Sequence, residues 1–353
     1  MWGRHKIVVA ATGLWARHKI AVTVVAVVAA AGLAAGLLAG QHGDPRMRQA
    51  SPPPLPVLSP PPLPSPSGPA RLRSPFTGEP VKRLNRVLAV KIDNIVYARP
   101  QTGLTHADIV YVLPVEGGLS RFLAIFSSHV PPVIGPVRSA RADDIRLLRQ
   151  FGRPAFAYSG ATAALLPWIR NHARIVNLYA GTASGYYRSA SRAAPYNLYT
   201  RPRALLGQSR HASTAHGIGF RFGLPLPGGR VTRSASVSYP AASFRFTWSA
   251  KRHRWLVWMD GQRAMTTDGG QMSAATVVIQ HTTVRTSVFL EYGVRPPYAQ
   301  STGSGTAQVL RDGKQWTTHW SRPHADGGTT FTTTSGQPMT FAQGQVWVVL
   351  AYR

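Results

Sequence analysis

The chain has 353 residues, and its 40 Lys and Arg residues against 12 Asp and Glu give a formal net charge of +28. It contains no cysteine, which excludes disulfide bonds, thiolate metal sites, a cysteine nucleophile and a lipid-modified cysteine. So basic a chain invites a nucleic-acid-binding interpretation. Only six of the basic residues are Lys, however, and a skew of this kind toward Arg can arise from codon bias alone. The sequence of the N-terminus therefore has to be used to predict on which side of a membrane the charged part of the chain lies.

The N-terminus carries an apolar segment long enough to cross a bilayer. Residues 20–40 form an uncharged run rich in Val, Ala and Leu, which matches a transmembrane helix in length. The basic residues of segment 1–19, among them Arg17 and Lys19, predict that this end is a cytoplasmic N-terminus. The sequence therefore predicts a single-pass plasma-membrane protein with its folded part extracytoplasmic, which disfavours nucleic acid as a partner. Removal of residues 20–40 as a signal peptide is the alternative.

After this run the composition changes twice. Residues 41–74 are dominated by Pro and Ser and predict an extended, semi-rigid stalk. Residues 75–208 contain short apolar runs typical of strands, such as Val87–Ile92 and Ile109–Leu113. They also contain a helix expected over Asp143–Phe151, with acids in its first turn and Gly152 after its end. This part of the chain predicts a mixed α/β N-terminal domain.

The remaining chain is expected to be a connector followed by strands. Residues 209–242 are rich in Gly, Ser, Pro and Arg, as connectors are. Residues 243–353 alternate polar and apolar side chains between turns and include four Asp-Gly pairs, which tight hairpins favour. The sequence therefore predicts a mainly-β C-terminal domain.

The scarce acidic residues point to one region. Five lie beyond residue 250, and four of those precede Gly, so turn chemistry explains them. Six lie between Glu79 and Asp144. Within that stretch Asp93 ends an apparent strand, Asp108 opens the next, and Glu116 precedes two glycines. Because α/β folds place their sites at strand ends and in the adjoining loops, these last three acids are the candidate catalytic residues.

The same stretch carries arginines suited to an anionic ligand. Arg99, Arg121, Arg138 and Arg141 offer planar forks that match phosphate or carboxylate. Carboxylates beside them could hold Mg²⁺ or Ca²⁺ as an ion bridging a pyrophosphate, although no ligand set can be assigned. The alternative is that these acids and arginines form structural ion pairs. Asn197 lies among tyrosines that could stack on a sugar ring or fill the core, and the 12 His residues show no metal-binding spacing.

A series of short motifs follows the stalk in a fixed order. They are FTGEPV (Phe76–Val81), KIDN (Lys91–Asn94), ARPQTGL (Ala98–Leu104), ADIVY (Ala107–Tyr111), VEGGLSRFLAIF (Val115–Phe126), IGPVRSAR (Ile134–Arg141), APYNLYT (Ala194–Thr200), STGSGTAQVLRDGKQW (Ser301–Trp316) and GQVWVVL (Gly344–Leu350). Together they resemble the YerB-like family of bacterial envelope proteins. The resemblance implies paired domains of unknown function held at the outer face of the membrane, often by a lipid. Here Gln41 follows Gly40, where the lipid-modified Cys would stand, so tethering would fall to the apolar segment itself.

The resemblance also bears on the candidate residues. It implies that the chain retains the family's Asp93, Arg99, Asp108, Glu116, Arg121, Arg138, Arg141 and Asn197. The chain departs from the family pattern at two places, with Val112 instead of Glu and Tyr196 instead of His. These departures weaken any mechanism that requires those two groups.

Two hypotheses of different classes remain open, and the sequence does not decide between a binding protein and an enzyme. The first is a membrane-tethered protein whose N-terminal domain binds an anionic envelope polymer or a phosphorylated headgroup through Arg121, Arg138 and Arg141. The second is a metal-assisted phosphoryl or glycosyl-phosphate transferase acting on a lipid-linked envelope precursor. A glycoside hydrolase that uses Asp108 and Glu116 as paired carboxylates is a weaker variant of the second.

Overall fold

The computed structural model describes residues 71–290 and 293–352. The expected cytoplasmic N-terminus, the membrane segment 20–40 and nearly all of the stalk lie outside these ranges. Inside them, no helix is both long and apolar enough to cross a membrane. The described chain is largely β, with three short α-helices: α1 (Ala142–Leu148), α2 (Leu165–His172) and α3 (Pro202–Gly207).

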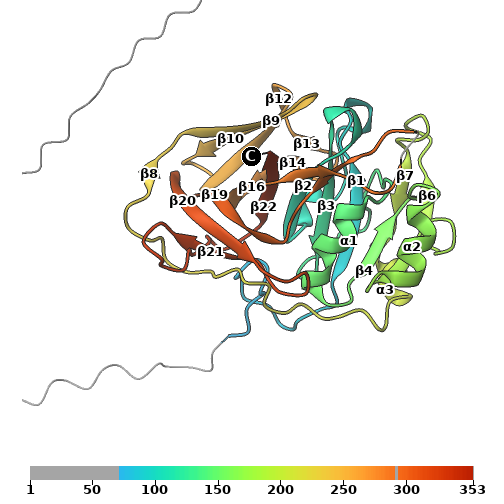
Figure 1. Ribbon diagram of the computed structural model, residues 1–353, viewed down its shortest axis with the longest axis horizontal. Helices are drawn as coiled ribbons and strands as arrows, with labels where there is room; N and C mark the ends of the chain where they lie inside the picture. Colours follow the sequence, from blue (N-terminus) through green and yellow to red (C-terminus); the bar gives the residue numbers. More distant parts are fainter. Residues whose placement is uncertain (1–70, 291–292, 353) are drawn as a thin grey trace, which may run out of the picture. The chain divides into compact units, whose positions relative to one another are not determined.

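One eleven-stranded sheet runs through the molecule (Figure 1). Its strand order is β21-β20-β19-β16-β22-β2-β3-β1-β4-β5, with β8 beside β20. Their bounds are β1 (Leu88–Asp93), β2 (Ile109–Pro114), β3 (Ser120–Phe126), β4 (Ala155–Tyr158), β5 (Val176–Tyr179), β8 (Arg230–Val231), β16 (Thr276–Thr282), β19 (Gly303–Arg311), β20 (Lys314–Arg322), β21 (Thr330–Thr333) and β22 (Val346–Tyr352).

The N-terminal and C-terminal parts of the chain meet inside this sheet. The last strand, β22, pairs in parallel with β2 on one side and with β16 on the other. Every residue of β2 and nearly all of β22 is buried, because strands at the centre of a sheet covered on both faces are apolar throughout. The two parts that sequence analysis separates therefore share one continuous sheet.

Each face of the sheet is covered by a different layer. On one face, α1 and α2 pack over residues such as Ala89, Leu123 and Ile125. On the other face lies a second, five-stranded sheet, and its Phe244 meets Phe122 edge-on. The second sheet has the order β12-β11-β10-β9, with β15 beside β11. Its strands are β9 (Ser234–Tyr239), β10 (Ala242–Ser249), β11 (Arg254–Met259), β12 (Gln262–Arg263) and β15 (Ser273–Ala274).

Three small ribbons and four 3₁₀ turns complete the described elements. The ribbons are β6 (Tyr186–Arg188) with β7 (Leu198–Thr200), β13 (Met265–Thr266) with β14 (Gly270–Gln271), and β17 (Val284–Thr286) with β18 (Pro297–Ala299). The 3₁₀ turns are η1 (Val96–Ala98), η2 (Leu104–His106), η3 (Glu116–Gly118) and η4 (Arg149–Phe151). The helix expected over Asp143–Phe151 corresponds to α1 continued by η4, and it stops at Gly152, whose φ is +72°.

All four Asp-Gly pairs lie in loops that join antiparallel strands, and two of them make the tight two-residue hairpin turn. Asp260 and Asp312 have φ of 49° and 48°, and the glycine after each also has a positive φ, as a type I′ turn requires. Asp326 differs, because its carboxylate accepts both hydrogen bonds of the Arg149 guanidinium fork. Asp326 therefore lies in the loop between β20 and β21 and also makes a surface ion pair.

Strand direction determines where side chains gather. β1, β4 and β5 are parallel to one another, and β1 and β2 are both antiparallel to β3. The carboxyl ends of β1, β2, β4 and β5 therefore lie at one edge of the sheet, where β3 begins. This edge carries the candidate site.

Candidate anion-binding site

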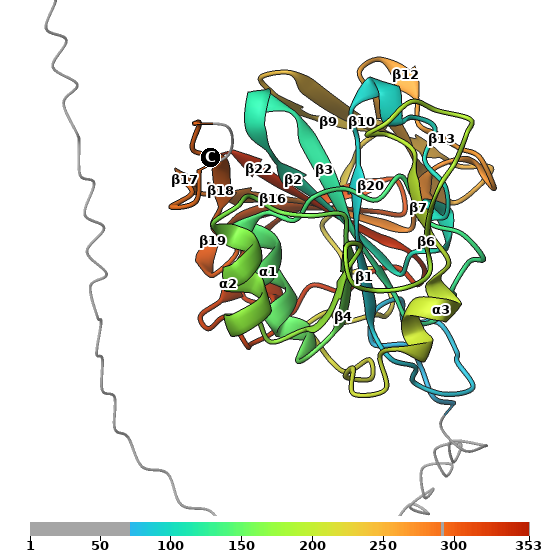
Figure 2. The ribbon, with the colours of Figure 1, turned by 90° about the vertical axis from the view of Figure 1, so that its right-hand side faces the viewer.

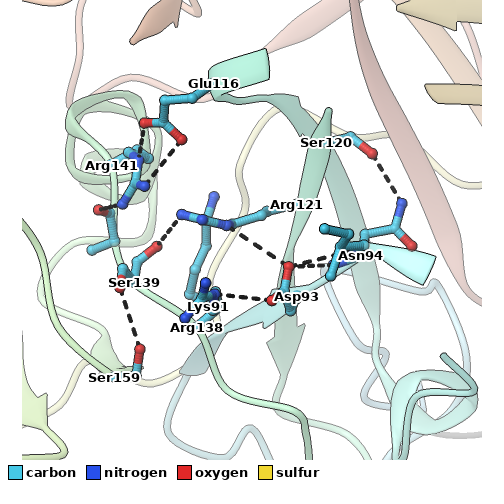
Figure 3. Close-up of polar contacts among 12 residues, drawn as sticks. Lys91, Asp93, Asn94, Glu116, Ser120, Arg121, Arg138, Ser139, Arg141 and Ser159 are labelled. Atoms are coloured by element: carbon cyan, nitrogen blue, oxygen red, sulfur yellow. Dashed lines mark hydrogen bonds and ion pairs between the residues drawn. The ribbon is translucent and has the colours of Figure 1, made fainter. Parts of the chain in front are cut away.

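Five of the eight residues singled out from the sequence line one pocket at this edge (Figure 3). The pocket has a volume of about 540 Å³. It contains Asp93, Glu116, Arg121, Arg138 and Arg141, which come from four different segments of the chain. Strand ends and the loops beside them thus bring together groups that are far apart in sequence, as open α/β sheets do.

Asp93 anchors the floor of the pocket. It is the last residue of β1 and lies directly opposite Arg121 of β3 in the antiparallel register. Its side chain is almost fully buried, and its Oδ1 accepts a hydrogen bond from the Asn94 amide at 2.9 Å. Oδ2 lies 2.9 Å from Arg138 Nε in an ion pair that lacks hydrogen-bond alignment. Asp93 therefore holds the arginines in place.

Glu116 and Arg141 form the opposite wall. Glu116 opens η3, where Gly117 and Gly118 take φ of 68° and 70°, a conformation that glycine adopts at no steric cost. Arg141 donates from Nε and Nη2 to the two carboxylate oxygens of Glu116, as a planar fork does. Burial acts to raise the pKa of Glu116, but its bond to Arg141 and the charge of that residue outweigh burial, and the pKa falls below its usual range. Glu116 is therefore a carboxylate at neutral pH.

Arg121 lies between these two pairs and is largely buried. Its side chain is 11% exposed, Nη1 donates to the Ser139 carbonyl at 3.2 Å, and Nε is 3.9 Å from Asp93 Oδ1. Burial lowers its pKa to about 10, with repulsion from Arg141 as the next cause. A bound anion would relieve that repulsion, because an opposite charge nearby favours the charged form.

A second layer below the pocket fixes Arg141. Asp144, in the first turn of α1, accepts a hydrogen bond from the backbone amide of Arg141 at 2.7 Å and another from Lys91 Nζ at 2.6 Å. Both Lys91 and Asp144 are fully buried. Sequence reasoning missed this pair, although Lys91 is the one cation in β1 and follows three apolar residues. It also missed Tyr196, which lines the pocket with its ring 5.7 Å from the Arg138 guanidinium carbon.

Three of the residues singled out from the sequence lie elsewhere. Arg99 pairs with Asp260 at 2.8 Å and so connects the loop after β1 to the second sheet. Asn197 accepts a hydrogen bond from Arg188 at 2.7 Å within the β6–β7 ribbon. Asp108 precedes β2, at the opposite edge of the sheet from the pocket. Of these three, only Arg99 makes an ion pair within the described part of the chain, whereas Asp108 accepts hydrogen bonds from backbone amides.

The position of Asp108 corrects one hypothesis. Asp108 and Glu116 stand at opposite ends of β2, whose six residues rise about 3.3 Å each, or roughly 20 Å in all. Paired glycosidase carboxylates are at most about 9.5 Å apart. Asp108 and Glu116 therefore cannot act as such a pair.

The sequence left the cofactor open, with Mg²⁺ or Ca²⁺ as candidates, and the described residues offer no preformed cluster of ligands for either ion. Across residues 71–290 and 293–352, no group of three or more His, Cys, Asp or Glu side chains is arranged to hold a metal. Both carboxylates of the pocket face arginines instead.

Comparison with known proteins places the chain in a family. The model described as "Protein of unknown function (DUF3048) N-terminal domain" matches residues 76–215, and the corresponding C-terminal domain model matches residues 235–348. A Bacillus subtilis protein named as a lipoprotein, YerB, is 34% identical over 138 residues, which is 38% of this chain and 42% of that relative. The chain belongs to the YerB-like family.

A solved structure agrees with this assignment at the level of the fold. The crystal structure of YerB from Bacillus subtilis matches with a TM-score of 0.68 and 22% identity, covering 80% of this chain and 97% of that one. The sequence match to the curated YerB relative spans less than half of that protein's length. The YerB-like family is described as one of unknown function, so the chemistry has to be argued from the pocket.

In this YerB-like chain Asp108 is expected to serve stability rather than ligand binding. Its Oδ2 accepts the backbone amides of Ser127 and Ser128 at 2.5 and 2.9 Å, and burial raises its pKa to about 6. Asp108→Ala leaves these two backbone amides without a hydrogen-bond acceptor. It should therefore lower the free energy of unfolding by about 2–3 kcal/mol, measured by denaturant titration. Asp108→Asn, which keeps an acceptor oxygen, should cost less. If Asp108→Ala left the free energy of unfolding unchanged but abolished anion binding, Asp108 would have to be counted as a ligand-binding residue instead.

Proposed function

We propose that this chain is a membrane-tethered, extracytoplasmic protein of the cell envelope that binds a phosphorylated or carboxylated group through Arg121, Arg138 and Arg141. The tether is inferred from the apolar residues 20–40 and from the relative that is named as a lipoprotein. An anionic envelope polymer and a phosphorylated headgroup share the chemistry that this pocket would recognise.

The observation that carries the proposal is the charge of the pocket. Three guanidinium groups, those of Arg121, Arg138 and Arg141, converge there with the two carboxylates of Asp93 and Glu116, and the nearest approach of Arg121 to Asp93 is 3.9 Å. Burial is the first cause of the lowered pKa of Arg121, and the second, repulsion from Arg141, is one that a bound anion would offset. Ser120 and Ser139 add hydroxyl groups to the lining and supply further donors for oxyanions.

Binding fits the geometry better than group transfer does. A transferase or hydrolase that used the carboxylates of this pocket would need one of them to be available as a base or nucleophile. In the described pocket Asp93 faces Arg138, and Glu116 is held by the fork of Arg141. Carboxylates engaged in this way orient arginines, which is what a binding site requires. The transferase hypothesis, metal-assisted or not, therefore has no geometric support of its own in this pocket.

Arg138→Ala tests the proposal in the purified full chain. The Arg138 side chain is 25% exposed, so its loss should disturb folding less than loss of the more buried Arg121. Removing a charged hydrogen bond of about 1.5–3 kcal/mol should weaken pyrophosphate binding roughly tenfold to a hundredfold, measured by titration calorimetry.

The matched control is Arg230→Ala, which removes the same charge from the exposed strand β8. Pyrophosphate affinity should be unchanged in that variant. Equal losses in both variants would mean that the overall charge of the protein, rather than the pocket, attracts the anion. No detectable pyrophosphate binding by the unmodified chain would rule the proposal out.

A further inference from the structure

Two further hollows lie beside the anion pocket, one after the other. It shares Val115, Glu116, Gly117 and Val294 with a second hollow of about 480 Å³. The second hollow shares Arg285 and Thr286 with a third of about 690 Å³. Because consecutive hollows are bordered by some of the same residues, the three lie next to one another in a row, and we call this row the trough.

The trough follows the border between the two parts of the chain. The first hollow is lined mainly by residues from the ends of β1, β2 and β3. The third is lined by α1 and α2 on one side and by the β17–β18 ribbon on the other. Figure 2 shows α1 and β18 side by side, and residues of these two elements are in contact. A ligand that fills the trough would therefore touch the N-terminal and the C-terminal parts together.

Positive charge continues along the trough. Arg285 and Arg295 line the second hollow, and Arg146, Arg149 and again Arg285 line the third. Arg149 is paired with Asp326, whereas Arg146 and Arg285 are exposed. Among the described lining residues of all three hollows the acids are Asp93 and Glu116 alone, and both lie in the anion pocket. One small anion in that pocket would leave the distal arginines without a partner in the ligand.

The far end of the trough also offers aromatic surface. Trp168 is 38% exposed there and lies 5.9 Å from Phe289, ring centre to ring centre. Tyr298 lines the same hollow, with the Arg146 guanidinium carbon 6.0 Å from its ring centre. Aromatic faces next to guanidinium groups suit a ligand that alternates organic units with anionic ones.

We infer that the trough binds a linear polyanion, a chain of phosphate groups joined by short organic units, with one phosphate in the anion pocket and others beside Arg285 and Arg146. This inference rests on the proposed function, because it extends the same pocket. It selects a polymer over an isolated headgroup, since a headgroup has no further charges to place along the trough.

The test uses glycerol-phosphate monomer, trimer and octamer as probes of the purified full chain. The octamer can bind in about eight registers, so only a gain in affinity above roughly eightfold over the monomer counts as extra contact. Arg146→Ala combined with Arg285→Ala should weaken octamer binding about threefold to tenfold, as two exposed ion pairs do. The same double variant should bind the monomer normally. Arg138→Ala should weaken both.

The control is Arg83→Ala combined with Arg230→Ala, which removes two exposed arginines outside the trough and should leave octamer binding unchanged. A chain that binds no monomer contradicts the proposed function itself. A chain that binds the monomer but gains no more than the statistical factor with the octamer overturns the inference alone. The inference is also overturned if the Arg146/Arg285 variant binds the octamer as tightly as the unmodified chain does. It is overturned as well if the chain binds phosphatidylglycerol vesicles more tightly than the octamer and the variant keeps this vesicle binding.

Discussion

Arg322→Met is expected to lower the free energy of unfolding by about 3–5 kcal/mol. The Arg322 side chain is fully buried, and its guanidinium donates to backbone carbonyls of Ser301, Gly327, Ala325 and the end of α1. Methionine approximates the length of the side chain but donates no hydrogen bond, so these buried carbonyls lose their partner. The expected loss is large because one residue satisfies several acceptors together.

The effect should reach the anion site through α1. The carbonyls of Arg146 and Leu147, at 2.8 and 3.4 Å from Arg322 Nη2, belong to the last turn of α1, where carbonyls have no partner within the helix. A cation at this end also favours the helix dipole. Since Arg141 stands at the start of the same helix, Arg322 ties the C-terminal part of the chain to the pocket wall.

Denaturant unfolding of the full chain measures this effect. Arg322→Lys keeps the charge but not the fork, so it should retain some of the bonds and give an intermediate loss. A change below about 1 kcal/mol for Arg322→Met would mean that these carbonyls find other partners. The argument that Arg322 supports α1 would then fail.

Much of the fold was predictable because its signals are local. The apolar runs of β1 and β2 and the acids at the start of α1 each identify an element without knowledge of its neighbours. The pairing of β22 with β2 is not local, because apolar strands carry no label for their partner. Sequence reasoning therefore separated two parts that the structure joins in one sheet.

The candidate site was predictable to a similar degree. Asp93, Glu116 and Arg121 lie near the same sheet edge because of strand direction, and the strand-end rule finds them. Asp108 also lies at a strand end and so satisfied the same rule. A strand has two ends, however, and the sequence does not say which of them lies at the site. Arg99 shows the other limit: its partner Asp260 lies in the second sheet, where only folding brings it close.

Lys91→Met is expected to lower the free energy of unfolding by about 3–5 kcal/mol at pH 8, the usual cost of removing one partner from a buried ion pair. Lys91 Nζ is 2.6 Å from Asp144 Oδ1, and both side chains are fully buried. Asp143, also buried, adds a second carboxyl beside them. Without Lys91, both acids remain in the interior with less compensating charge.

The loss of unfolding free energy caused by Lys91→Met should increase as the pH rises. Burial and the neighbouring Asp144 raise the pKa of Asp143 to about 7, against the opposing charges of Lys91 and Arg141. Because this folded-state pKa exceeds the unfolded value of about 3.9, the protonated carboxyl favours the fold at low pH. That contribution is lost as the pH rises from about 4 to about 7. Removing Lys91 should raise the pKa of Asp143 further, so the variant should keep losing stability above pH 7.

The difference in stability between Lys91→Met and the unmodified chain should therefore be small at pH 5 and large at pH 8, as followed by denaturant unfolding at each pH. Lys251→Met makes the same replacement at an exposed position and should change stability by less than about 0.5 kcal/mol at either pH. A Lys91→Met loss that is equal at both pH values would show that packing, not charge, decides the effect. Since Asp144 also holds the backbone amide of Arg141, pyrophosphate binding should weaken at pH 8 in the Lys91→Met molecules that remain folded. The buried pair would then join the stability of the fold to the position of the pocket's arginine.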